Sequence, residues 1–296
     1  MADEPAEGTA PCTFSLIVST LGRGSDIVRL FESLERQSCP SFEVIVVDQN
    51  DDDRVGAALA GRDWPFPVSR IRTPGERGLS RGRNVGWRRS NGAVVGFPDD
   101  DCWYPPTLLA DVRRLMGSGG PDILCGRAAD ETGRSINGRF ETRPQNVTRR
   151  NVWTTQIEWM VFFRRASLES VGGYDEGLGV GAPTPWQAAE GQDILLRALD
   201  AGLVCRYDPA LYGHHAELNV ETPDAAMRRK GRMYARGMGF VLRKHGFGPE
   251  IAAYWAMRAV ANLVRSALSG YGRRTSYYAQ VALGRLEGWA GRGTPL

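Results

Sequence analysis

Apolar and polar residues alternate along the first hundred positions in blocks that predict short buried strands separated by amphipathic helices. Phe14–Thr20 and Phe42–Asp48 are rich in apolar and β-branched residues, and the later half of the second run is apolar throughout. Runs of this kind are typical of parallel strands that are covered on both faces. Between them, apolar residues recur with helical spacing from Ile27 to Leu34, and Pro40 lies beyond that predicted helix.

The same alternation continues as far as residue 207. We expect strands at 68–71, 93–97, 122–126, 158–163 and 204–207, and helices at 55–59, 79–89, 107–116, 164–171 and 194–201. Alternating strands and helices predict an α/β fold with a doubly wound, mostly parallel sheet, in which ligands bind at the carboxyl ends of the strands.

Two long segments interrupt the alternation. Residues 126–150 are polar and rich in arginine, and residues 174–190 are rich in glycine and proline. Loops of this length in a compact domain are usually functional. From Met227 onward the pattern is helical, with a break at Gly246–Pro249. We therefore expect a disordered tail at 1–12, an α/β domain at 13–225 and a helical C-terminal extension at 226–296.

Charge is distributed unevenly along the chain. Residues 227–296 contain thirteen Lys and Arg against two acids, a net charge of +11, whereas the whole chain carries +3 and the remainder therefore −8. This basic extension is suited to an anionic partner such as phospholipid or nucleic acid, and it is equally compatible with a solvated helical face.

The cysteines and the lengths of the apolar runs indicate the cellular compartment in which the protein is expected to lie. The five cysteines are scattered and show no CxxC spacing, which argues against a disulfide framework or a zinc site and fits a reducing cytosol. We expect no signal peptide in the acidic N-terminal residues and no spanning helix, because no window approaches eighteen uninterrupted apolar residues. The expected location is cytoplasmic, with peripheral contact at the inner face of the membrane through the extension.

Three adjacent carboxylates, Asp99, Asp100 and Asp101, stand where the strand at 93–97 should end. Packed like charges need a compensating cation or raised pKa values, and carboxylates at a strand end suit a divalent metal with a bound diphosphate. Three Asp can also simply mark a turn. Thr20 and Asp48 fall at the ends of the first two strands, so these side chains are expected to converge at one edge of the sheet.

The ordered motifs resemble those of family 2 glycosyltransferases, which are inverting enzymes of the GT-A fold. The matching pieces, spread over residues 14–215, are Ser19-Thr20, Val46-Val47-Asp48, Gly78-Leu79-Ser80, Arg83-Asn84-x-Gly86, Asp99-Asp100-Asp101, Gly172-Gly173-Tyr174-Asp175-Glu176 and Glu190-Gly191-Gln192-Asp193 with Leu195-Leu196-Arg197. The resemblance implies a GT-A catalytic domain at 13–225 and says little about the extension.

The resemblance implies a nucleotide-diphosphate sugar as donor. Thr20 and Asp48 would lie near the base and ribose, and Arg83 would lie near the diphosphate. Asn84, Asp99 and Asp100 are the other donor-binding candidates, and they are named with the same motifs.

The resemblance also implies Mg²⁺ or Mn²⁺ as cofactor. Asp99 and Asp101 form an Asp-x-Asp pair, in which Asp101 is the first choice as a direct ligand, and His214 or His215 lies late enough in the domain to be another. The metal would neutralise charge that builds on the departing diphosphate. A surface turn remains the other interpretation of the two histidines.

Inversion requires an acceptor hydroxyl to attack the anomeric carbon while a carboxylate takes its proton. The family usually has an adjacent Glu-Asp pair with the Asp as base, whereas this chain has Gly191 in the second position. Glu190 is the first candidate for the base and Asp193 the second, although Asp193 also suits a helix N-terminus. Trp186 is a candidate for stacking on the acceptor or for anchoring the loop.

The expected acceptor is a saccharide or a lipid-linked saccharide, in the assembly of a polysaccharide or glycolipid of the cell envelope, and we expect no nucleic-acid partner. Three alternatives remain open at this point. They are a nucleotidyltransferase, for which Gly22-Arg23-Gly24 is a weak phosphate loop, a nucleic-acid-binding module that uses the basic extension, and a non-catalytic sugar-binding protein.

Overall fold

The computed structural model describes residues 13–218 and 220–293, so the tail predicted at 1–12 lies outside the described residues. Within them, eight strands form one mixed sheet in the order β3-β2-β1-β4-β7-β5-β8-β6. The strands are β1 (Phe14–Thr20), β2 (Phe42–Asp48), β3 (Val68–Arg72), β4 (Val94–Gly96), β5 (Ile123–Ala129), β6 (Gln145–Asn146), β7 (Val161–Arg164) and β8 (Cys205–His214).

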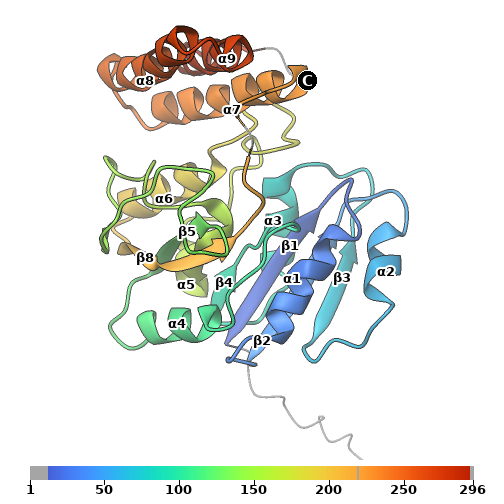
Figure 1. Cartoon of the computed structure of the whole chain (residues 1–296). Helices are drawn as coiled ribbons and strands as arrows, with labels where there is room; N and C mark the ends of the chain where they lie inside the picture. The colour runs from blue at the N-terminus through green and yellow to red at the C-terminus, as the bar shows by residue number, and fades with distance from the viewer. Residues whose placement is uncertain (1–12, 219, 294–296) are drawn as a thin grey trace, which may run out of the picture.

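Helices cover both faces of this sheet (Figure 1). They are α1 (Asp26–Glu35), α2 (Arg54–Leu59), α3 (Leu79–Trp87), α4 (Leu108–Leu115), α5 (Arg165–Ser170) and α6 (Glu190–Asp200), with a 3₁₀ turn η1 (Glu158–Met160) before β7. This arrangement confirms the predicted α/β fold with a doubly wound, mostly parallel sheet.

The alternation of side chains along β1 explains why helices are needed on both faces. Leu16 and Val18 pack into a core on one face together with α1 and α4, whereas Ile17 packs into a core on the other face together with α6. All three are completely buried. Strands buried on both sides are apolar in sequence without a gap, which is why the sequence pattern located them.

Strand directions determine where a ligand can bind. β1 is parallel to β2 on one side and to β4 on the other, with Thr20 paired to Asp48 and Leu16 paired to Gly96. The chain order reverses here, because β2 and β3 lie to one side of β1 and β4 to the other. Such a reversal opens a crevice at the carboxyl ends of the strands. β7 is antiparallel to both β4 and β5.

Two predicted elements are wrong in extent. The strand expected at 158–163 begins only at Val161, because residues 158–160 form the turn η1. The helix expected at 194–201 begins four residues earlier, at Glu190. As a result, Glu158 lies on η1 and Glu190 lies on α6, both beside the carboxyl end of the sheet.

Two further corrections concern the part of the sheet beyond β7. The strand expected at 204–207 extends to His214, because Pro209 interrupts the apolar pattern without ending the strand. The polar segment 126–150 contains the short strand β6, which pairs with β8.

The C-terminal extension forms α7 (Ala225–Lys244), α8 (Pro249–Leu268) and α9 (Gly272–Trp289), which lie beyond the end of the sheet (Figure 1). The predicted break at 246–249 is confirmed, and a second break at 269–271 was not predicted. α7 and α9 pack very closely, since a Cβ on Gly239 or Gly288 would overlap the backbone of the opposite helix. In the described part of the chain, no helix is long and apolar enough to span a bilayer.

Candidate active site

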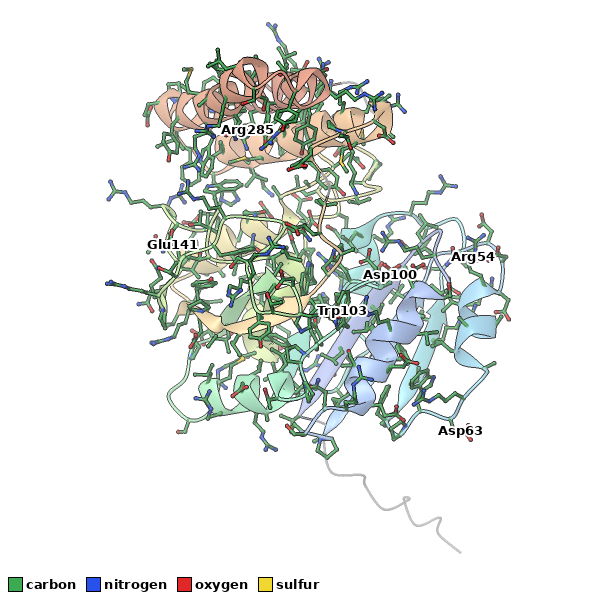
Figure 2. The ribbon with its side chains drawn as sticks, viewed as in Figure 1. Arg54, Asp63, Asp100, Trp103, Glu141 and Arg285 are labelled. Atoms are coloured by element: carbon green, nitrogen blue, oxygen red, sulfur yellow. The ribbon has the colours of Figure 1, made fainter. Side chains whose placement is uncertain are left out.

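Polar side chains gather at the carboxyl ends of β1, β2 and β4, where the chain order reverses, and this end of the sheet is called the crevice below. Figure 2 shows Asp100 at this end of the sheet, on the side that faces the C-terminal helices. The Thr20 hydroxyl donates a hydrogen bond of 2.6 Å to Asp100 Oδ2, which links the ends of β1 and β4. The structure therefore brings together side chains that the sequence placed on separate strands.

Arg23, in the turn after β1, neutralises part of the three-Asp segment. Its Nη1 lies 2.7 Å from Asp100 Oδ1 and also forms an ion pair with Asp101. Burial raises the pKa of Asp100 to about 6, although Thr20 and Arg23 act in the opposite direction. The Arg23 side chain is 44% exposed, so it can rearrange when a ligand enters. The sequence offered only a weak signal for this residue, its place between two glycines after the first strand.

Asp48 lies at the end of β2 and is completely buried. Its carboxylate accepts hydrogen bonds from the Asn50 backbone N–H (3.0 Å) and side-chain amide (2.8 Å), and from Arg70 Nε (2.9 Å). These contacts hold the Asp48 carboxylate and shape the loop after β2, beside the place where the resemblance implies a base and ribose.

Arg83 is the largest fully buried side chain and lies on α3. Its Nη2 lies 3.1 Å from Asp99 Oδ1, its Nη1 lies 3.4 Å from Glu190 Oε1, and its guanidinium lies 5.2 Å from the centre of the Tyr174 ring. Burial disfavours its charge, but Tyr174, Asp99 and Glu190 outweigh that cost and raise the pKa of Arg83. A permanent cation therefore joins two carboxylates that are 91 residues apart in the sequence.

The position of Arg83 depends on close packing between α3 and β1. A Cβ on Gly82 would overlap the Ser19 side chain, and a Cβ on Gly86 would overlap Ile17. Glycine at these two positions lets the helix lie against the strand and directs Arg83 to the crevice.

Asn84, the next residue of α3, faces a different partner. Its side chain accepts from the Tyr174 backbone N–H (2.9 Å) and donates to the Tyr174 carbonyl (2.9 Å) and to Glu176 (3.0 Å). These bonds clamp the start of the loop at 174–189 to α3. The donor-binding role predicted for Asn84 stays a prediction, and its contacts give it a positioning role.

Asp101 and His215 face each other. His215 Nε2 lies 3.1 Å from Asp101 Oδ1, and its Nδ1 lies 2.7 Å from the Ala216 carbonyl. Burial opposes a charge on His215, yet the hydrogen bonds to Asp101 and Ala216 raise its pKa overall. Burial likewise acts against the Asp101 charge, but His215 and Arg23 outweigh it and lower the pKa of Asp101.

His214 has other partners. Its Nδ1 lies 3.2 Å from the Ala129 carbonyl, and its ring stacks on Trp103 with 5.6 Å between ring centres. The backbones of His214 and Trp103 also pair with each other. These contacts tie the end of β8 to the segment that follows the three Asp.

Among the described residues, no group of three or more His, Cys, Asp or Glu side chains is arranged as a complete metal site. Asp101 and His215 nevertheless place an oxygen and a nitrogen donor side by side, and Asp99 lies within electrostatic reach of both. Two protein donors fit a divalent ion whose remaining ligands come from a diphosphate and water. The geometry favours Asp101 and His215 over Asp99, which pairs with Arg83, and over His214.

Glu190, the first residue of α6, is 4% exposed and faces Arg83. Burial and the nearby Glu158 charge raise its pKa to about 7, although Arg83 acts in the opposite direction. The preceding residue, Ala189, has a φ of 72°. That left-handed conformation is costly for a residue other than glycine, and such conformations cluster at functional sites.

Asp193 lies one turn further along α6 and is completely buried. Its carboxylate lies 2.9 Å from Arg197 Nε, 2.7 Å from Lys244 Nζ and 2.8 Å from His245 Nε2. Burial would raise the pKa of Asp193, but the hydrogen bonds from His245 and Lys244 and the Arg197 charge lower it to about 2. These contacts engage the Asp193 carboxylate and hold the end of α7 on α6, and its role as a base stays a prediction.

Trp186 also contacts the C-terminal extension. Its ring stacks on Phe240 of α7, with 4.4 Å between ring centres and 9° between ring planes. Of the two roles that the sequence left open for Trp186, this packing supports the anchoring of the loop at 174–189, and acceptor stacking stays a prediction.

Besides Arg23, two further described residues of the crevice were not among the sequence candidates for the site. Glu158 of η1 acts electrostatically on Glu190, Arg83 and Asp99, and Tyr234 of α7 lies within reach of the same acidic groups. No local signal marks them, because η1 was expected to be strand and α7 was expected to lie outside the domain.

Comparisons with known proteins show what the chain is similar to in sequence and in fold. The family model for glycosyl transferase family 2 matches residues 15–172. An uncharacterized glycosyltransferase of Haemophilus influenzae is 39% identical over 102 residues, which cover 34% of this chain and 34% of that protein. The aligned parts span between 34% and 48% of the lengths of the first curated relatives.

Solved structures of glycosyltransferases share the fold of this chain. The mannosyltransferase PcManGT of Pyrobaculum calidifontis, in complex with GDP-Man and Mn²⁺, has a TM-score of 0.64 at 14% identity, over 96% of this chain and 90% of that one. Staphylococcus aureus TarS 1–349, in complex with UDP-GlcNAc, has a TM-score of 0.55 at 19% identity, over 95% and 92% of the two chains. The chain therefore has the fold of these glycosyltransferases.

Proposed function

The chain belongs to glycosyl transferase family 2, and from this premise we propose that it is an inverting, metal-dependent enzyme. It transfers a sugar from a nucleotide-diphosphate sugar to an acceptor hydroxyl, in the assembly of a polysaccharide or glycolipid. Support for the donor class comes from structural neighbours that hold GDP-Man with Mn²⁺ or UDP-GlcNAc.

The observation that carries this proposal is the single guanidinium of Arg83 between Asp99 and Glu190. Asp99 belongs to the segment after β4, where a diphosphate would lie, and Glu190 belongs to α6 on the opposite side of the crevice. A transferase needs both a site for the leaving group and an acidic group for the acceptor within one crevice, and Arg83 links the two sides.

On the donor side, the cations Arg23 and Arg83 favour a diphosphate in the crevice at the ends of β1 and β4. Arg23 is partly exposed and lies beside Asp100, whereas Arg83 is buried and held by Asp99 and Glu190. Positioned cations that face the place where negative charge develops stabilise the transition state without reorganisation. The loops that begin at Thr20 and Asp48 would border the base and ribose.

A divalent metal, when bound, would supply Lewis-acid stabilisation of the leaving diphosphate. Asp101 and His215 are the residues that would hold it, with Asp99 nearby. Arg23 forms an ion pair with Asp101 and would exchange that partner for the diphosphate.

On the acceptor side, a carboxylate takes the proton of the attacking hydroxyl. Glu190, with a pKa of about 7, belongs to this side of the crevice. Asp193, with a pKa of about 2, is a much weaker base and faces the cations Arg197 and Lys244. We therefore place the acid–base chemistry beside the N-terminal end of α6, where the carboxylates of Glu190 and Glu158 interact, and give Asp193 a structural role.

The proposal is tested by incubating the protein with Mn²⁺ or Mg²⁺ and a panel of UDP-, GDP- and dTDP-sugars, with methyl glycosides and water as acceptors. The release of nucleoside diphosphate is measured. Expected is metal-dependent release from one donor class, with β-linked product from an α-linked donor. Pyrophosphate release from a nucleoside triphosphate and a sugar phosphate would instead indicate a nucleotidyltransferase. If no donor is consumed and one is bound, the protein is a sugar-nucleotide-binding protein without this activity.

We also propose that the extension contacts an anionic membrane surface at the cytoplasmic face, where a lipid-linked acceptor would be presented. Met257, Val264 and Leu268 recur with helical spacing along α8 and are 61%, 48% and 84% exposed. Arg258 and Arg265 follow two of them in the sequence. Exposed apolar residues with neighbouring arginines are typical of helices that lie in a membrane interface.

A further inference from the structure

Glu158 is a carboxylate of the crevice for which the described residues 13–218 and 220–293 supply no partner. It is the first residue of η1 and is half-buried. Its charge acts on Glu190, Arg83 and Asp99, yet in the described part of the chain it forms no hydrogen bond and no ion pair. Because partly buried carboxylates usually have donors, the free oxygens of Glu158 are available to a ligand that enters the crevice.

Gly191 gives Glu158 its position. A Cβ on residue 191 would lie 2.5 Å from Glu158 Cγ and 3.3 Å from Glu158 Cδ. The Glu158 side chain therefore occupies the space that any side chain at position 191 would need, next to Glu190 on the first turn of α6. The missing second carboxylate of the Glu190-Gly191 pair is thus replaced in space by one from a different element.

Gln156 provides an independent sign that a ligand binds here. Its side chain is 4% exposed, and both of its polar atoms lack partners among the residues described. Its Oε1 lies 3.1 Å from the point that a Cβ on Gly191 would occupy, which is also beside Glu158. Leaving a buried donor or acceptor without a hydrogen bond destabilises a protein by about 1–3 kcal/mol. A ligand with hydroxyl groups would supply the hydrogen bonds that the Gln156 amide lacks.

We infer that Glu158 is the general base of the transfer reaction, and that Gln156 orients the acceptor hydroxyl. This inference rests on the proposed function. The acceptor O–H bond breaks and its proton moves to a Glu158 carboxylate oxygen, while the hydroxyl oxygen forms a bond to the anomeric carbon. The bond between that carbon and the diphosphate breaks, and its electron pair leaves with the nucleoside diphosphate. The proton passes to water when the product departs.

Glu158 is better suited to this step than Glu190. Glu190 is 4% exposed and faces Arg83 at 3.4 Å, so one of its oxygens is already engaged by a permanent cation. Glu158 is more exposed, and no Lys, Arg or His among the described residues forms an ion pair with it. Glu190 is then a positioning residue, because it holds the Arg83 guanidinium between the donor and acceptor sides.

The experiment uses the full chain and the nucleotide sugar that the panel shows to be consumed fastest. Glu158→Gln is compared with the exposed surface control Glu169→Gln on α5. Expected is a loss of kcat on the order of 10²–10⁴-fold for Glu158→Gln with the donor KM little changed, because general-base catalysis contributes about that much. Formate should restore part of the activity to Glu158→Ala, which a merely structural role would not allow.

A second variant relocates the carboxylate. Glu158→Ala removes the Cγ atom that blocks position 191, so Asp fits there in the Glu158→Ala/Gly191→Asp double variant. Expected is a recovery of kcat of about tenfold or more over Glu158→Ala alone. This variant also keeps the inference testable if Glu158→Gln folds poorly.

The outcomes separate this inference from the proposed function. If the wild-type protein consumes no nucleotide sugar, the proposed function is overturned, and the inference with it. If the wild type is active and Glu158→Gln keeps its kcat within about threefold, general-base catalysis by Glu158 is overturned and the proposed function stands. An equal loss of donor affinity and kcat, without formate rescue, would overturn the role as base.

Discussion

Arg83 and Glu190 form a buried ion pair, with 3.4 Å between Arg83 Nη1 and Glu190 Oε1. The two side chains are 2% and 5% exposed. The pair connects α3, which packs on β1, with α6, which packs on the other half of the sheet. Because the pair is shielded from water, removing either side chain leaves a buried charge without its partner. Such a change should affect both the stability of the fold and the chemistry of the crevice.

Arg83→Met should destabilise the protein by about 3–5 kcal/mol at pH 8, since it leaves buried carboxylates without their cation. The loss should be smaller at pH 5, where Glu190 is protonated. Urea unfolding at the two pH values measures this, with Arg81→Met on the exposed face of α3 as the matched control. An equal loss at both pH values would contradict the role of Arg83 as counter-charge to Glu190.

The raised pKa of Glu190 predicts how stability changes with pH. Its pKa in the folded protein is about 7, against an ordinary 4.5, because burial and the neighbouring Glu158 and Asp99 outweigh Arg83. The native state therefore binds more protons than the unfolded state between these values. Stability should fall by about 3 kcal/mol as pH rises from 4.5 to above 7.

Glu190→Gln should remove most of this decline, because an amide does not titrate. Urea unfolding between pH 5 and pH 8 measures the slope for both proteins. Glu169→Gln serves as the control and should follow the wild-type curve. A Glu190→Gln curve with the wild-type slope would show that Glu190 titrates at its ordinary pKa.

Local patterns predicted the sheet and its ligand-binding end, because parallel strands buried on both faces are apolar without interruption. They missed the extent of β8, since Pro209 is an unusual residue within a strand and β5 shifts its register against β8 at Gly126. They also missed the start of α6 at Glu190, because Gly191 lowers helical propensity.

The sequence predicted those site residues that lie within a single local motif. The three-Asp segment and Arg83 lie next to glycines or strand ends, so their roles follow from neighbours in the sequence. The Glu158 side chain occupies the space next to Gly191, beside Glu190, and Arg23 forms an ion pair with Asp100 from a different strand end. These relationships depend on tertiary packing and have no counterpart in local spacing.

Asp101→Ala should abolish metal-dependent release of nucleoside diphosphate and weaken Mn²⁺ binding in the presence of UDP or GDP. The reason is that Asp101 and His215 are the paired donors facing each other at 3.1 Å. Electron paramagnetic resonance of free Mn²⁺ measures binding without relying on turnover. Asp111→Ala on the surface of α4 is the control. Unchanged Mn²⁺ binding in Asp101→Ala would move the metal to other ligands.

Asp193→Asn should destabilise the protein by about 2 kcal/mol at neutral pH, as expected when a pKa of 3.8 is lowered to about 2. The carboxylate contributes this stability above about pH 4 and loses it as the pH falls toward 2. Unfolding in urea at pH 7 and pH 3 measures the difference. Asp200→Asn, an exposed residue of the same helix, should have little effect. Loss of transfer without loss of stability would instead return Asp193 to the list of catalytic candidates.

The extension should bind anionic vesicles through the exposed face of α8. We expect the full chain to float with vesicles of phosphatidylcholine that contain phosphatidylglycerol, and to float less at high salt, because the attraction of Arg258 and Arg265 to the surface is screened. Replacing Met257, Val264 and Leu268 together with Ser should weaken binding about tenfold or more, since burying apolar side chains in the interface stabilises the bound state. Val204→Ser, at another exposed apolar residue far from α8 in the sequence, is the control. Binding that is equal for the triple variant and the wild type would show that this face does not contact the membrane, whereas binding that is independent of phosphatidylglycerol would remove the role of the arginines.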